Sequence, residues 1–114
     1  MALYLHSTSS EEKLHAGISV NRLLRTVKVG DRVVKLTFSE FGIFYFLAKN
    51  PYKVISRERL LKEIWQENDG KGVEKVAVHM TRLRKKINFD RNRNHLIRTI
   101  WGSGYLFDPS QGLA

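Results

Sequence analysis

The stretch from Val73 to Ile87 constrains the fold of this chain more than any other segment. Its apolar residues recur at spacings of three and four, so at 100° per residue they fall within one narrow sector of a helix. These residues are Val76, Met80, Leu83 and Ile87. The pattern predicts an amphipathic helix that packs this stripe on a core and turns its other side to solvent.

The opposite side of this predicted helix is basic. Lys75, Val78, Arg82 and Lys85 project away from the stripe, Glu74 and Thr81 lie beside them, and Ala77, His79, Arg84 and Lys86 lie on the flanks. Residues 71–98 hold nine Lys and Arg against two acids, and so account for seven of the nine net positive charges of the chain. A local charge of this sign favours a polyanionic partner, nucleic acid above all, although such helix faces are often simply solvated.

The rest of the chain predicts one domain around that helix. Its 114 residues, 42% of them hydrophobic, suffice for one compact core. From Gly17 to Leu36, short β-branched runs broken at Asn21-Arg22 and Gly30-Asp31 predict three antiparallel strands. Residues 1–13 are interpreted as a linker or disordered segment, or an edge strand, residues 14–109 as the domain, and residues 110–114 as a tail.

Two further helices precede the basic one. Thr37 and Glu40 have the spacing of a capping box, so a helix should begin at Phe38 and end before Pro51. Ser56 should cap the second, whose apolar stripe is Leu60, Leu61, Ile64 and Trp65.

The C-terminal part predicts a hairpin. Residues 68–72 form a loop before the basic helix, and a charged loop with Asp90, Arg91 and Arg93 follows it. Residues 96–100 and 105–107 then have strand composition, and residues 101–104 form the turn between them.

Several function classes find no support in the sequence. The chain has no cysteine, and His6, His15, His79 and His95 are scattered without metal-ligand spacing, so we expect no metal, no cofactor and no catalytic residues. Gly102-Ser103-Gly104 lacks the lysine of a phosphate-binding loop and is interpreted as a turn. Apolar runs such as residues 41–48 are far shorter than the roughly 18 residues of a membrane span, and no signal-peptide core is visible. We therefore expect a non-enzymatic, cytoplasmic protein.

Five segments together resemble the C-terminal effector domain of OmpR/PhoB-class response regulators. They are LTFSEF (36–41), VISRERLL (54–61), IW (64–65), VAVHMTRLRKKI (76–87) and IRTIWGSGY (97–105). Their order and spacing carry the resemblance from Gly17 to Phe107. It implies an α+β winged helix-turn-helix with an N-terminal antiparallel sheet, three helices and a C-terminal hairpin wing.

The resemblance also implies DNA-binding residues. It makes residues 73–87 the recognition helix in the major groove, with Lys75, Val78 and Arg82 facing bases and His79, Thr81 and Arg84 near phosphates or bases. Arg82 is suited to guanine and Val78 to a thymine methyl group. Lys85 and Lys86 are the remaining DNA-binding residues of the recognition helix. Trp65 is either a phosphate donor or a packing residue. The wing, about residues 96–107, lies near the minor groove and adds four residues: Arg98, Thr99, Trp101 and Tyr105.

Two positions depart from the resembled family. Ala77 stands where the family often has Asp or Asn, which removes a polar base contact or a link to a neighbouring Arg. Trp101 stands where the wing often has Arg, a side chain that reaches a narrow, electronegative minor groove. Trp101 could instead stack on sugar, pack against the wing or contact a protein.

The partners implied by the resemblance are duplex DNA with tandem half-sites and RNA polymerase, the latter through loop 66–72. The domain should be mostly monomeric and pair on DNA, in a bacterial cytoplasm at the nucleoid. The receiver domain of the family is not in this sequence, which fits either an effector piece of a longer regulator or a regulator without a receiver. The main alternative function is a protein-interaction module with Trp65 and Trp101 as anchors; an enzyme ranks third.

Overall fold

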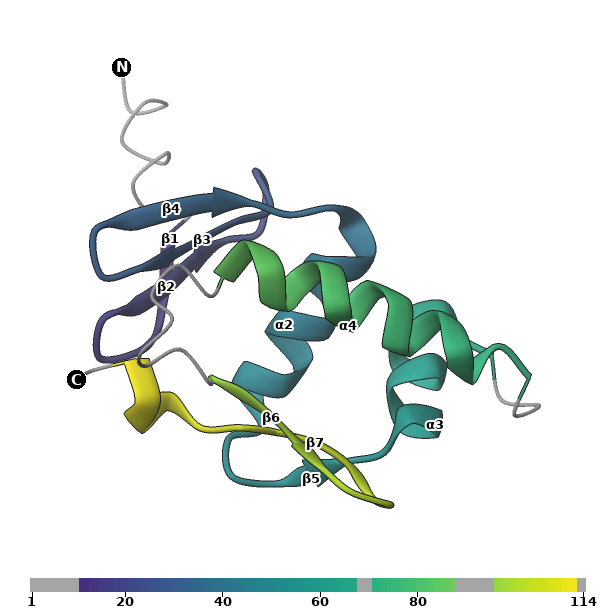
Figure 1. Cartoon of the computed structure of the whole chain (residues 1–114). Helices are drawn as coiled ribbons and strands as arrows, with labels where there is room; N and C mark the ends of the chain where they lie inside the picture. Colours follow the sequence, from purple (N-terminus) through teal and green to yellow (C-terminus); the bar gives the residue numbers. More distant parts are fainter. Residues whose placement is uncertain (1–10, 68–70, 88–95, 113–114) are drawn as a thin grey trace.

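The computed structural model describes residues 11–67, 71–87 and 96–112. Two antiparallel sheets lie at either end of a small group of helices (Figure 1). Strands β1 (Glu11–His15), β2 (Ile18–Asn21), β3 (Thr26–Val29) and β4 (Arg32–Lys35) pair in sequence order. The helical part contains α2 (Phe38–Lys49), α3 (Arg57–Leu60) with its π-helical continuation η1 (Leu61–Trp65), and α4 (Val73–Ile87).

The C-terminal hairpin is part of a three-stranded sheet. Strands β6 (Ile97–Ile100) and β7 (Gly104–Phe107) form the predicted hairpin, and the two-residue strand β5 (Val54–Ile55) pairs with the far side of β7. A 3-10 turn, η2 (Pro109–Gly112), follows and includes residues that we interpreted as a tail. The predicted winged helix-turn-helix is confirmed, with β5 as an unforeseen third strand beside the wing.

The three strands predicted between Gly17 and Leu36 are confirmed as β2, β3 and β4, and β1 adds a fourth at the edge, where the sequence left a linker or an edge strand open. Its sequence, EEKLH, has no β-branched residue, so composition does not mark it as a strand. Tertiary contacts hold it instead: the Tyr45 hydroxyl donates to Glu12 at 2.9 Å, and His15 Nε2 lies 2.9 Å from the Ala48 carbonyl oxygen. Hydrogen bonds from Lys49 and Tyr45 also lower the pKa of the Glu12 carboxyl. Contacts to α2 therefore order β1.

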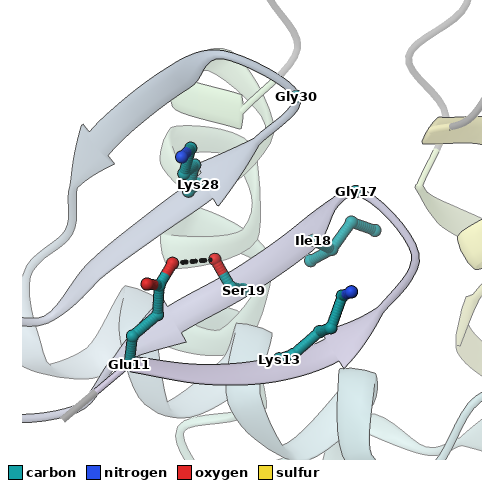
Figure 2. A pocket seen from close by; sticks show the side chains of 7 residues that line it. All are labelled: Glu11, Lys13, Gly17, Ile18, Ser19, Lys28 and Gly30. Atoms are coloured by element: carbon teal, nitrogen blue, oxygen red, sulfur yellow. Dashed lines mark hydrogen bonds between the residues drawn. The ribbon is translucent and has the colours of Figure 1, made fainter. Parts of the chain in front are cut away.

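A pocket of about 470 Å³ lies on the N-terminal sheet (Figure 2). The Ser19 hydroxyl donates to a Glu11 carboxylate oxygen at 2.7 Å inside it, and Lys13 and Lys28 provide its cations. No histidine is among the residues that line the pocket. It has the composition of a solvated sheet surface.

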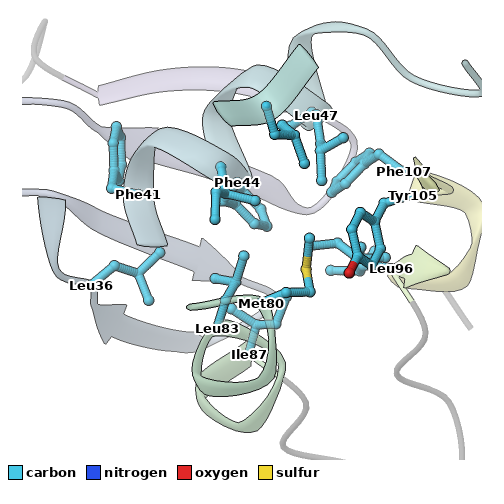
Figure 3. Packing of buried hydrophobic residues seen from close by; sticks show 14 of the residues in the cluster. Leu36, Phe41, Phe44, Leu47, Met80, Leu83, Ile87, Leu96, Tyr105 and Phe107 are labelled. Atoms are coloured by element: carbon cyan, nitrogen blue, oxygen red, sulfur yellow. The ribbon is translucent and has the colours of Figure 1, made fainter. Parts of the chain in front are cut away.

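The core lies between the helices and both sheets (Figure 3). The predicted stripe of α4 faces it, since Val76, Met80, Leu83 and Ile87 are each at most 2% exposed. Burying side chains of this size contributes roughly 1.5 to 3 kcal/mol each. Phe44 packs edge-on against Phe107 with ring centres 5.5 Å apart, which ties α2 to the wing sheet.

Both predicted helix starts are confirmed. Glu40 N–H donates to the Thr37 hydroxyl while the Glu40 carboxylate accepts from Thr37 N–H, and Arg59 N–H donates to the Ser56 hydroxyl. The second helix departs from α geometry after four residues and ends at Gln66, whose φ of 61° is left-handed. Leu60 and Leu61 are buried as predicted, whereas Ile64 and Trp65 are half-buried.

Gly104 allows the wing to approach β5 closely. Its φ is +145°, and a Cβ at this position would clash with the Ile55 carbonyl oxygen and lie 2.8 Å from the Ser56 Cα. Gly102, in the same turn, has a φ of +77° but open space around it.

We expect Gly104→Ala to destabilise the domain by at least about 3 kcal/mol, because backbone strain and a backbone clash act together. Gly102→Ala is the matched control, and its left-handed φ alone should cost about 1 kcal/mol. Urea unfolding of the two variants measures the difference. Equal losses would show that the approach of β7 to β5 does not require glycine.

Candidate nucleic-acid interface

The solvent side of α4 presents the surface that its sequence pattern predicts. Arg82, Lys85, Glu74 and Thr81 are exposed, and Val78 is an exposed apolar side chain among them. The Thr81 hydroxyl donates to the Ala77 carbonyl oxygen of the preceding turn at 3.0 Å. Arg82 and Lys85 are therefore the cations that this face offers to a ligand.

Lys75 lies in a contact cluster rather than projecting freely. Its ammonium group donates to Glu67 at 2.8 Å and lies 5.3 Å from the centre of the Trp65 ring. Trp65 in turn contacts His79, with ring centres 5.4 Å apart. The cluster fixes the end of η1 against the first turns of α4, so Trp65 packs as well as bordering the interface.

His79 packs its imidazole against the Trp65 ring. Its Nδ1 is buried and has no hydrogen-bond partner within the described ranges. The ring is only half-buried as a whole. Its contact with Trp65 joins the flank of α4 to the end of η1.

Arg84 joins α4 to the wing. Its guanidinium donates to the Thr99 hydroxyl at 2.7 Å and lies 5.4 Å from the centre of the Tyr105 ring. Burial lowers the pKa of Arg84, against a smaller opposing effect from Tyr105. These three predicted site residues thus contact each other and set the wing at a fixed place beside the helix.

Lys86 pairs with the buried carboxylate that caps α2. Its ammonium group donates to Glu40 Oε1 at 2.7 Å, and Glu40 is 1% exposed. Burial by itself raises the pKa of the Glu40 carboxyl, but hydrogen bonds from Lys86 and the Thr37 backbone outweigh it and lower the pKa below 4.5. The capping-box spacing predicts only the role of Glu40 as a helix cap, and this link to the basic helix was not predicted.

The wing carries one strongly exposed aromatic side chain. Trp101, in the turn between β6 and β7, is 92% exposed. A groove of about 300 Å³ lies beside it, between the wing turn and Arg57 and Glu58 at the start of α3. Arg98 is exposed on β6, 3.5 Å from an Asp108 carboxylate oxygen.

Some predicted features lie outside the described residues. These are the loop cations Arg91 and Arg93, the loop acid Asp90, and residues 68–70 of the predicted polymerase-contacting loop. Within the described ranges, no group of three or more His, Asp or Glu side chains could hold a metal ion. No helix in that same part of the chain has the length and apolar character needed to cross a bilayer.

Comparison with known proteins finds one family for this arrangement. A model of the family described as "Transcriptional regulatory protein, C terminal" matches residues 31–107. The transcriptional regulatory protein SrrA of Staphylococcus aureus is 40% identical over 83 residues. That alignment covers 72% of this chain and 34% of SrrA, so the chain spans about a third of the length of the curated relatives it matches.

Solved structures share the fold. The DNA-binding domain of Klebsiella pneumoniae RstA, in complex with the RstA box, superposes with a TM-score of 0.73 at 26% identity, over 87% of this chain and 97% of that one. The response regulator DrrB, described as a Thermotoga maritima OmpR/PhoB homologue, gives a TM-score of 0.69 at 31% identity, over 94% of this chain and 48% of DrrB. Both are similar to this chain along most of its length.

We expect Lys86→Ala to lower the free energy of unfolding by about 1 to 2 kcal/mol at pH 7. This is less than the loss of a fully buried ion pair, because Lys86 is itself partly solvated. The exposed Lys85 is the matched control, and Lys85→Ala should change stability by less than about 0.5 kcal/mol. Denaturant unfolding of both variants checks this.

The same pair predicts a pH dependence. Because the pKa of Glu40 is lowered on folding, its contribution is complete above the ordinary carboxyl pKa of 4.5 and is lost as the pH falls through the lowered value. The difference between wild type and Lys86→Ala should therefore shrink on acidification to about pH 3. A difference that stays constant with pH would argue against the Glu40 pairing.

Proposed function

The chain belongs to the family of transcriptional regulatory protein C-terminal domains, and from this premise we propose that it binds duplex DNA sequence-specifically as the output domain of a two-component response regulator. The observation that carries the proposal is the division of α4 into a fully buried apolar stripe and an exposed face with Arg82 and Lys85. The RstA domain, whose fold this chain shares, is described in complex with its DNA box. The family is not a class of enzymes.

In the proposed complex, α4 enters the major groove with Val78 and Arg82 toward the base edges. A guanidinium can donate to O6 and N7 of guanine together, and an apolar side chain can contact a thymine methyl group. Lys85, one turn further along the exposed side, reaches a phosphate. Lys75, Arg84 and Lys86 act chiefly by positioning, since each already contacts another part of the domain.

The wing follows the helix onto the DNA. Arg84 joins α4 to β6 and β7, so a duplex that receives α4 also meets the wing. Arg98 lies on the exposed side of β6 and would contact the phosphate backbone. We assign the DNA-binding unit to residues 14–109 together with β1, whose contacts to α2 make it part of the same domain.

The assembly follows from the geometry of the duplex. Two copies on tandem half-sites about 10 to 11 base pairs apart would lie on one face of the DNA. We propose that the domain is largely monomeric alone and pairs on such sites, with loop 66–72 directed to RNA polymerase. A chromosomal ligand implies a bacterial cytoplasm and association with the nucleoid.

Binding should weaken steeply with salt, because cations of the basic face replace counterions at the phosphates. If about six phosphates are neutralised, the logarithm of the association constant should fall with the logarithm of salt concentration at a slope near −5. Fluorescence anisotropy across a salt series measures the slope. The labelled duplex has about 30 base pairs, roughly the length that two half-sites require. A slope near zero would remove the electrostatic part of the proposal.

Arg82→Ala should weaken the binding free energy by about 1 to 3 kcal/mol on a selected site and by little on random duplex, because a base contact carries sequence information. Lys85→Ala, one turn away on the same face, should weaken binding to both duplexes alike. Titration of the two variants on the two duplexes gives their specificity ratios. Equal losses for Arg82→Ala on both duplexes would mean that Arg82 contacts only the backbone.

A further inference from the structure

The tip of the wing differs in chemistry from the basic face of α4. From Ile100 to Gly104 the chain carries no charged side chain, and its outermost large group is the indole of Trp101. That side chain is 92% exposed, whereas Trp65 is half-buried against His79. An aromatic side chain left almost wholly in water exposes apolar surface that a partner could cover.

The wing holds this indole on a rigid support. Ser103 N–H donates to the Ile100 carbonyl oxygen at 2.9 Å and closes the turn. Gly104 brings the next strand against Ile55, and Arg84 holds Thr99 on the preceding strand. Trp101 is therefore presented outward by an ordered turn, beside the groove that Arg57 and Glu58 border.

The link between the wing and α4 favours the DNA duplex as the partner of Trp101. Because Arg84 joins the wing to α4, we expect a duplex seated on Arg82 and Lys85 in the proposed complex to meet the wing as well. An uncharged indole gains little from the negative potential of a narrow minor groove. The indole instead contributes binding free energy by covering the apolar surface of sugars and bases. The most base surface is accessible where a base step unstacks.

We propose that Trp101 is a specificity-determining residue, an apolar wedge that selects a deformable pyrimidine–purine step in the minor groove beside the α4 site. This inference rests on the proposed function. Pyrimidine–purine steps such as TpA and CpA unstack most easily and so require the least energy to admit a ring. A·T content as such should matter little, because A-tracts are stiff.

Selection from a pool of random 30-base-pair duplexes, with wild type, Trp101→Ala and Trp101→Arg in parallel, tests the inference. Wild type should enrich one central motif and a pyrimidine–purine step at a fixed distance from it. Trp101→Ala should keep the motif and lose the step, with about tenfold weaker binding to duplexes that contain it. Trp101→Arg should keep the motif and prefer A-tracts instead.

The outcomes separate the inference from the proposed function. If wild type enriches no motif, the proposed function fails. If wild type and Trp101→Ala enrich the same motif with the same step, DNA binding stands and the wedge is overturned. Thermal melting shows that the variants fold, and an exposed side chain should leave the melting temperature nearly unchanged.

Fluorescence gives a second, independent measurement. Trp65→Phe leaves Trp101 as the only tryptophan, and its emission should shift to the blue and be quenched when a selected duplex is added. Emission that stays unchanged at saturation overturns the proposal. Self-association without DNA that is lost in Trp101→Ala also overturns it, in favour of a protein contact.

Discussion

The buried carboxylate of Glu40 is the point on which the helical arrangement depends. It accepts from the Thr37 backbone at the start of α2 and from Lys86 at the end of α4, while it is 1% exposed. A buried carboxylate without these donors would be costly, so the start of one helix and the end of the other are stabilised together. This pairing and the buried apolar stripe of α4 together hold the end of α4 against the start of α2.

A second link sets the wing relative to the same helix. Arg84 uses one donor on Thr99 and its planar face on Tyr105, so one side chain of α4 contacts both strands of the hairpin. The Lys and Arg side chains of α4 thus divide into two kinds. Arg82 and Lys85 remain directed to solvent, whereas Lys75, Arg84 and Lys86 hold the surface in shape.

Local pattern predicted the elements whose stability is local. The capping box at Thr37 and the stripe of α4 were correct to the residue, because both depend on spacing along one helix. The sequence left β1 undecided between a linker and an edge strand, because its order comes from α2, through Tyr45 and Ala48, and no periodicity reports such contacts. Helical periodicity placed Lys86 and Arg84 on the correct flanks, but the partners that engage them, Glu40 and Thr99, lie 46 and 15 residues away in sequence.

Among the strands that the structure describes, β4 lies at an edge of the N-terminal sheet, with Val33 exposed between Arg32 and Lys35. An exposed β-branched residue on an unpaired edge is the usual start of sheet-to-sheet aggregation. Arg32 and Lys35 place positive charge on this strand, and two molecules that approach through β4 would bring like charges together. The cations of β4 therefore oppose sheet-to-sheet association, separately from the basic face of α4.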